Sequence, residues 1–218
     1  MKIKYLGHAS FLITSKDGKK LVTDPYESGS YGGAIGYTPI KETVDAVTVS
    51  HNHEDHNCTK QLPGKPTVIK DTGSQTASGM SFAGIATYHD ESKGSERGKN
   101  NIYIITIDGM KVCHLGDLGH RLSKDEVSKI GPIEILLIPV GGYFTIDAKA
   151  ATDVMEALKA KITIPMHFKT KKVGFPIDPV DKFLEGKKNA KKVGGSEIEV
   201  EKEKLPTAPE IWVLEPAL

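Results

Sequence analysis

The stretch Ser50-His51-Asn52-His53-Glu54-Asp55-His56 follows the apolar run Ala46-Val47-Thr48-Val49 and places three imidazoles and two carboxylates within residues 51–56. Imidazole binds zinc, manganese and iron, and carboxylate adds a hard oxygen donor. In a strand, His51, His53 and Asp55 would share one face while His56 pointed to the other. The ligands therefore require an irregular turn after a strand, where they can face two adjacent metal ions. A solvated polar loop is the alternative, but this density of histidine rarely arises by chance.

The composition is that of a globular protein without a strong overall charge. The 218 residues are 38% hydrophobic and 26% charged, which suits a single domain over residues 1–218. The net charge of +1 gives no global field that would attract nucleic acid or an anionic membrane. No apolar run approaches the roughly 20 residues that span a bilayer. Because Cys58 and Cys113 are the only cysteines and residues 2–6 read as a strand rather than a signal peptide, we expect a cytoplasmic protein.

The order of apolar and turn segments predicts a mixed α/β fold. Strands are expected at residues 2–6, 10–14, 20–24, 45–50, 101–107, 111–115, 135–140, 197–201 and 210–214. Asp-Gly pairs at residues 17–18 and 108–109 predict hairpin turns between neighbouring strands. Helices are expected at residues 122–130, where Ser123 and Glu126 form a capping-box pattern, at 148–159 and near 179–184. We interpret residues 171–218 as scaffold.

The histidine-rich string resembles the HxHxDH signature of the metallo-β-lactamase superfamily of hydrolases. That family's other motifs occur here in the same order: a strand ending in Asp24, a solitary His89, the pair Gly116-Asp117, and His167 after an apolar strand. The opening Leu6-Gly7-His8-Ala9-Ser10-Phe11-Leu12-Ile13 is similar to the branch of L-ascorbate-6-phosphate lactonase and its bacterial and archaeal relatives. The resemblance covers about residues 1–170 and implies an α/β (α+β) fold, the four-layer αββα sandwich of the metallo-β-lactamase fold.

The same resemblance implies a dinuclear metal site, residue by residue. One ion would be held by His51, His53 and His89, the other by Asp55, His56 and His167, with Asp117 bridging. Asp55 and Asp117 are accordingly the catalytic candidates. Zinc is favoured by imidazole-rich ligation, although manganese or iron fits the same donors.

Three further residues are candidates to support these ligands. Asp24 has a plain interpretation as the start of an Asp-Pro turn, but the resemblance places it beneath the HxHxDH loop, where it would orient a ligand. His114 competes with Asp117, because an alternating strand could point it inward; we place it behind the ligands. His8 could reach the metal cleft or serve as a structural histidine, and both interpretations stay open.

Substrate-contacting residues are expected in the loops that follow the ligands. Arg97 offers a fork for an anion, or is a solubilising side chain of a charged loop. Tyr143 and Thr145 follow the buried strand at 135–140, where loops tend to line sites. Lys169 could contact an anionic substrate or belong to a surface cluster. The glycine-rich segment 26–38 suggests a flexible lid, with an ordinary surface loop as the alternative.

Two divalent ions would hold a bridging hydroxide as nucleophile, which suits hydrolysis of an ester, lactone or phosphoester bond. We expect the substrate to be a small, anionic metabolite, with neither nucleic acid nor membrane as a partner; a homo-oligomer is compatible with the resemblance. One alternative is a phosphodiesterase or nuclease on the same ions. Another is a non-catalytic metal-binding or sensing module, although a closed structural zinc site needs only four ligands.

Overall fold

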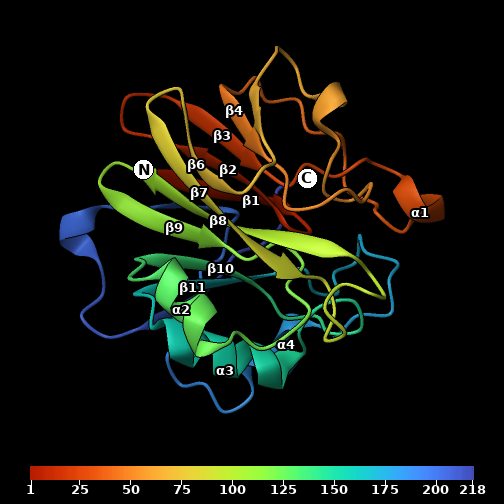
Figure 1. Cartoon of the computed structure of the whole chain (residues 1–218), viewed down its shortest axis with the longest axis vertical. Helices are drawn as coiled ribbons and strands as arrows, with labels where there is room; N and C mark the ends of the chain where they lie inside the picture. Colours follow the sequence, from red (N-terminus) through yellow and green to blue (C-terminus); the bar gives the residue numbers. More distant parts are fainter.

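The computed structural model describes residues 1–218 and consists of two β-sheets packed face to face (Figure 1). The first sheet has six strands in the order β13 (Glu197–Glu199), β1 (Lys2–Gly7), β2 (Ser10–Thr14), β3 (Lys20–Thr23), β4 (Ala46–Thr48) and β5 (Thr67–Ile69). The second has eight strands in the order β12 (Ala190–Lys192), β14 (Glu210–Val213), β11 (Ile162–Met166), β10 (Ile135–Pro139), β9 (Met110–His114), β8 (Lys99–Ile107), β7 (Met80–Tyr88) and β6 (Gly73–Ala77).

The main core lies between the sheets and beneath the helices, and comprises 46 buried residues. Strand alternation selects its members, since successive side chains point to opposite faces of a sheet. In β1 and β2, for example, Tyr5 and Phe11 join this core and stack at 4.9 Å between ring centroids. Their neighbours Leu6 and Leu12 point to the outer face.

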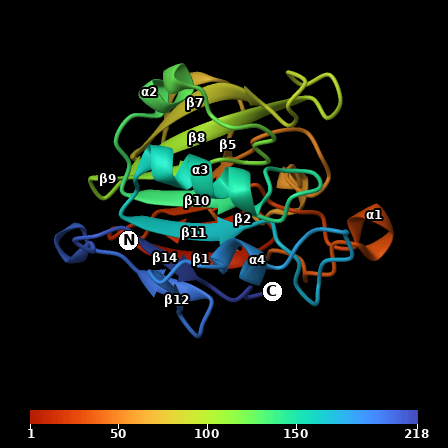
Figure 2. The same cartoon turned by 90° about the horizontal axis from the view of Figure 1, so that it is seen from below.

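Helices cover only one of the two outer faces. The helices α2 (Lys124–Ile130), α3 (Ala148–Leu158) and α4 (Val180–Leu184) lie over the eight-stranded sheet (Figure 2). The expected capping box forms, with Ser123 and Glu126 each bonding the other's backbone. The outer face of the six-stranded sheet is covered instead by loop residues in a cluster of 12 buried side chains, and α1 (Ser30–Gly33) is only a short turn.

The expected mixed fold is confirmed, with differences in individual elements. The predicted strand at 45–50 ends early, at Thr48, because the backbone turns away to form the histidine loop. Short strands that carry few apolar residues were not predicted, among them β6 and β12. They form because each pairs with an apolar neighbouring strand rather than through its own hydrophobic pattern. None of the helices has the length and hydropathy needed to cross a membrane.

Strand direction brings the candidate ligands to one edge of the sandwich. In the first sheet β3 and β4 are parallel, so the residues after Thr23 and Thr48 leave at the same end. In the second sheet β9, β10 and β11 are parallel, and β7 runs the same way because it is antiparallel to β8, which is antiparallel to β9. Loops that follow parallel strands meet at their carboxyl ends. This edge therefore receives all the loops that carry the predicted ligands.

Candidate metal centre

The predicted ligands converge in two adjacent groups at this edge. One group comprises His51, His53 and His89, and the other comprises His8, Asp55, His56 and His167; within each group the potential ligand atoms lie within 4.8 Å of one another. The first two histidines and the Asp55-His56 pair come from the irregular loop after β4, in which the His56 amide donates to the His53 carbonyl at 2.9 Å. The turn removes the strand alternation that would have separated His56 from its neighbours.

Asp117 lies between the two groups. Its Oδ2 atom is surrounded by imidazole Nε2 atoms: His56 at 3.1 Å, His89 at 3.2 Å, His167 at 3.3 Å and His51 at 3.9 Å. A single carboxylate is therefore in contact with members of both groups. The side chain is 2% exposed, so these contacts lie in a medium that strengthens electrostatic interactions.

The residues fit a metal centre. Asp117 Oδ1 is buried and makes no hydrogen bond, and the buried His56 Nε2 has only the carboxylates of Asp117 and Asp55 near it, at 3.1 and 3.6 Å. Buried polar atoms in native proteins are nearly always paired, so an unpaired carboxylate oxygen among five imidazoles is consistent with a partner that is not a protein group. The donors are imidazole nitrogens and carboxylate oxygens, the set preferred by zinc and also accepted by manganese and iron.

The electrostatics of the cluster suit cation binding. Burial lowers the pKa of His51 to about 3, which keeps that imidazole neutral and able to ligate. Burial would raise the pKa of Asp117, but the adjacent His167 and His56 hold it well below its ordinary value. Burial would likewise lower the pKa of His56, yet Asp117 and Asp55 raise it well above the usual range. A metal ion bound here would compete with a proton for the His56 imidazole.

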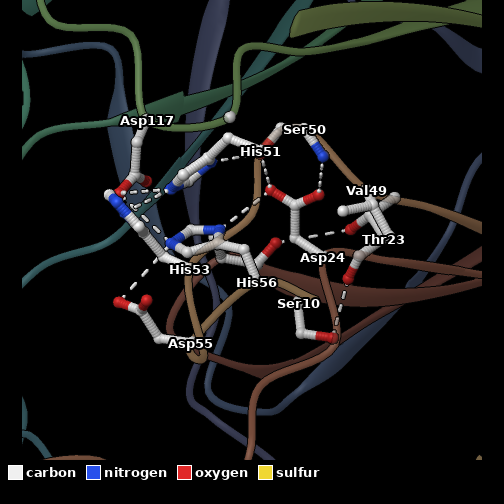
Figure 3. Close-up of polar contacts among 12 residues, drawn as sticks. Ser10, Thr23, Asp24, Val49, Ser50, His51, His53, Asp55, His56 and Asp117 are labelled. Carbon is white, nitrogen blue, oxygen red and sulfur yellow. Dashed lines mark hydrogen bonds and ion pairs between the residues drawn. The ribbon is translucent and has the colours of Figure 1, made fainter. Parts of the chain in front are cut away.

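Asp24 is hydrogen-bonded to the histidine loop on the side away from Asp117 (Figure 3). Its carboxylate is fully buried and accepts hydrogen bonds from the Ser50 amide at 2.8 Å, from the Ser50 hydroxyl and from His56 Nδ1 at 2.9 Å. The Ser50 hydroxyl also lies 2.9 Å from His51 Nδ1. Partners on Nδ1 orient the rings so that Nε2 faces the cluster. The sequence did not single out Ser50, although it directly precedes the first histidine.

His8 lies inside the cluster. Its Nε2 is 2.9 Å from Asp55 Oδ2, and its ring centroid is 4.1 Å from that of His167. Burial, followed by the nearby His167, lowers the pKa of His8 to about 4, against the opposing effect of Asp55. The neutral ring can therefore donate to Asp55 and fix its orientation. The structure thus places His8 among the candidate ligands, although it is fully buried and does not line the cavity above them.

His114 and Asn100 hold the turn that presents Asp117. His114 Nε2 donates to the Ala9 carbonyl at 2.8 Å, and its Nδ1 accepts from the Gly116 amide at 3.1 Å. The Asn100 side-chain oxygen accepts from the Asp117 amide at 2.9 Å. Gly116 has a φ of 55°, and a Cβ there would lie 2.3 Å from that oxygen. His114 thus points away from the ligand atoms, and Asn100 is a supporting residue that the sequence analysis missed.

A cavity of about 340 Å³ opens over the cluster. Three aromatic side chains form part of its wall, with ring centroids 5.4 Å apart for Tyr31 and Phe175 and 5.3 Å apart for Phe144 and Phe175. Arg97 and the adjacent Glu96 also line it. The Tyr31 hydroxyl donates to Asp55 Oδ1 at 3.3 Å. The expected Arg97 therefore lies at the site, and the aromatic residues are additions that only the structure identifies.

Tyr143 is not part of this cavity. Its side chain is 65% exposed, and the next residue, Phe144, lines the cavity in its place. The reason is local: Tyr143 has a φ of 61°, which reverses the direction of the chain between the two rings. Thr145 is buried and lines a neighbouring cavity.

Lys169 has a structural contact rather than a position in the cavity. Its ammonium donates to the Phe175 carbonyl at 2.7 Å, and its amide donates to the Asp178 carbonyl at 2.8 Å. These bonds close the loop that carries Phe175. Lys169 therefore acts on the cavity only by holding this aromatic wall.

The segment 26–38 is anchored over most of its length. Tyr26, Ile35 and Tyr37 are at most 3% exposed and belong to the outer core cluster. The Gly36 amide donates to the Lys172 carbonyl at 2.7 Å. Only the tip around Tyr31, which is 46% exposed, is left outside this packing. The expected lid is thus reduced to a short tip, because apolar side chains in the segment are buried.

Asp90 organises the loop that carries Arg97. Its carboxylate accepts four backbone N–H groups, from Ser92, Gly94, Glu96 and Arg97, at 2.8 to 3.1 Å. Burial would raise the pKa of Asp90, but these hydrogen bonds lower it below the ordinary value. The Asp-x-Ser-x-Gly spacing is a turn signal that the sequence analysis did not use.

We expect Asp90→Ala to loosen this loop and to raise KM. Protease cleavage within residues 90–98 should become about tenfold faster, since losing even one charge-assisted hydrogen bond changes an opening equilibrium by that order. Limited proteolysis followed by mass spectrometry measures the effect. Ser95→Ala, in the same loop, is the control. Equal cleavage of Asp90→Ala and the unsubstituted protein would show that the carboxylate does not order the loop.

Comparison with known proteins agrees with the geometry. Residues 2–167 match a family described as the beta-lactamase superfamily domain. A crystal structure from Thermotoga maritima, described as a candidate Zn-dependent hydrolase of the metallo-β-lactamase superfamily, is 38% identical, superposes with a TM-score of 0.80 and covers 98% of each chain. Relatives named UPF0173 metal-dependent hydrolase include one from Carboxydothermus hydrogenoformans, 30% identical over 78% of this chain and 85% of its own. Another, from Archaeoglobus fulgidus, is 27% identical over 92% of this chain and 94% of its own.

The matched region contains the strand ends and loops that bring the histidines and Asp117 together. The fold, the cluster of candidate ligands and the similar proteins therefore support the same family assignment. The chain belongs to the metallo-β-lactamase superfamily, as one of its metal-dependent hydrolases.

Proposed function

We propose that this protein uses two divalent metal ions to hydrolyse an ester, lactone or phosphoester bond of a small, anionic metabolite. The observation that carries the proposal is the position of Asp117 Oδ2, 3.1 to 3.3 Å from ligand atoms of both histidine groups. When bound, a pair of ions would supply a water ionised near neutral pH and would polarise the scissile carbonyl or phosphoryl group.

Residues of the chain would hold the two ions, and further residues would orient the side chains that hold them. His51, His53 and His89 would hold one ion and Asp55, His56 and His167 the other, with Asp117 between them. His8 and Tyr31 would fix the two oxygens of Asp55, to which they are hydrogen-bonded at 2.9 and 3.3 Å. Asp24 would hold His56 in the tautomer whose Nε2 is free to ligate. Zinc is the ion that five imidazole donors favour, with manganese or iron as alternatives.

The residues that line the cavity indicate the general class of substrate. Tyr31, Phe144 and Phe175 offer an apolar surface beside the metal centre, and Arg97 offers a cation. This combination suits a molecule with an apolar portion and an anionic group, such as a lactone or cyclic ester that carries a charge. We place the protein in the cytoplasm, where free cysteines such as Cys58 and Cys113 stay reduced. A small molecule, rather than nucleic acid or membrane, is the proposed partner, and self-association into a homo-oligomer is compatible with this function.

Metal content and turnover test the proposal together. Elemental analysis should find about two ions per chain, and a panel of lactones, esters and phosphodiesters should reveal turnover that is abolished by chelation. Faster cleavage of a generic phosphodiester than of any lactone would shift the assignment to a phosphodiesterase or nuclease. At most one tightly held ion, with no turnover in zinc, manganese or iron, would instead indicate a binding or sensing module.

A further inference from the structure

A second cavity, of about 680 Å³, lies beside the metal centre; we call it the basic groove. Its lining includes His51 and His53 of the histidine loop and three cationic side chains, those of Lys70, Arg97 and Lys99. No carboxylate is among its lining residues. His53 and Arg97 also line the metal cavity, so the two spaces adjoin.

The cations of the basic groove have few internal partners. Arg97 forms one ion pair, with the adjacent Glu96 at 3.5 Å. The lysines that form ion pairs with carboxylates are others, so Lys70 and Lys99 have no such partner. Unpaired charges of one sign in a shared hollow repel one another and raise the local concentration of anions. Both lysines are exposed at the groove, so their ammonium groups can move to meet a ligand.

The positively charged lining of the basic groove extends only a short distance along the surface. A further cavity, of about 360 Å³, shares Arg97 and is lined by four carboxylates, those of Asp90, Glu91, Glu96 and Asp147; its other cation, Arg121, is paired with Asp153 at 2.7 Å. A long polyanion crossing the site would meet these groups. The basic groove is therefore suited to a single terminal anionic group rather than to the continuous backbone of a nucleic acid.

We propose that the basic groove binds the anionic end of the substrate, a phosphate or carboxylate group, while the scissile bond lies over Asp117. This inference rests on the proposed hydrolytic function and adds Lys70 and Lys99 as residues that determine specificity. Arg97, at the junction of the two cavities, contacts the anion with its fork, and the lysines neutralise the remaining charge. Neither lysine touches the reacting atoms, so both affect substrate binding more than the chemical step.

The kinetic test uses the metal-loaded protein and two substrates with the same scissile bond, one neutral and one with a terminal phosphate. Lys70→Met and Lys99→Met should each raise KM for the phosphorylated substrate about 3- to 10-fold, with kcat nearly unchanged. KM for the neutral substrate should stay constant. Lys65→Met is the matched control, because Lys65 is exposed and lies outside the groove. An unchanged KM for the phosphorylated substrate in both variants would overturn the inference.

A second measurement does not depend on turnover. Reductive methylation of lysines, followed by mass spectrometry, should be slowed several-fold at Lys70 and Lys99 by inorganic phosphate, but not by chloride at equal ionic strength and not at Lys65. If phosphate slows methylation of Lys70 and Lys99 in a protein that hydrolyses none of the substrates, the result would support an anion site in the basic groove and would contradict the proposed hydrolase function. Equal slowing of methylation at Lys65, or equal slowing by chloride, would overturn the proposal that the basic groove binds an anion. Protection by single-stranded RNA but not by phosphate would overturn it in favour of a nucleic-acid site.

Discussion

Replacing Asp117 with alanine is expected to remove at least one of the two proposed metal ions and to lower kcat/KM by about 10³-fold or more. The carboxylate contacts imidazoles from both ligand groups, so its loss would deprive both proposed ions of a shared oxygen donor. It also leaves four histidines around an apolar methyl group. Elemental analysis of the purified variant and steady-state kinetics measure the two effects.

Two further variants separate the loss of metal from the loss of fold. Asp117→Asn keeps the shape of the side chain and removes its charge, so it should also lose metal while its circular dichroism spectrum stays unchanged. Asp125→Asn, on the exposed first turn of α2, should leave metal content and kcat/KM as they were. Full metal content and activity in Asp117→Asn would contradict the bridging role.

Replacing Asp24 with alanine is expected to destabilise the metal-free protein by about 3–5 kcal/mol and to weaken metal binding by about 10- to 100-fold. The substitution leaves the buried Ser50 amide and hydroxyl and His56 Nδ1 without their acceptor. Unpaired polar groups in a dry interior carry their full cost of desolvation. Urea unfolding in the presence of chelator and competition with a chromogenic chelator measure the two effects separately.

The variant Asp24→Asn tests specifically whether the Asp24 carboxylate orients the His56 ring. The amide oxygen can still accept from the Ser50 amide, but its NH₂ group cannot accept from His56 Nδ1. Stability should fall less than in the alanine variant, whereas metal affinity should fall by a similar amount. Asp45→Asn is the control, since Asp45 also accepts a backbone amide, that of Lys20 at 2.8 Å, but far from the cluster. Metal affinity unchanged in Asp24→Asn would show that the carboxylate does not orient His56.

Much of the candidate site could be predicted because its ligands are close together in the chain or follow strong apolar strands. The HxHxDH loop, Gly116-Asp117 and His167 each come directly after a buried strand, and a strand followed by a turn places a side chain at a sheet edge. Order along the chain and resemblance then suffice to group them. The short polar strands could not be predicted, because pairing with neighbours rather than their own sequence pattern holds them in the sheet.

The cavity wall was predicted less well, for a physical reason. Tyr31, Phe144 and Phe175 come from three loops that no periodic pattern describes, and they meet only after the sandwich has closed. A single positive φ at Tyr143 decided which of two adjacent aromatic rings faces the metal centre. Lys169 and Asp90 act by tying loops, through bonds to backbone groups whose positions depend on the whole fold.

The sequence alone determined the mixed fold, the identity of the candidate ligands and the class of chemistry, because these follow from residue types and from their spacing and order along the chain. The tertiary structure alone decided that Asp117 lies between two groups of histidines, that His8 contacts Asp55, and that a basic groove adjoins the metal cavity. Those relations join residues as far apart in the chain as Asp55 and His167, and only the packing of two sheets brings the potential ligand atoms of such distant residues to within 4.8 Å of one another.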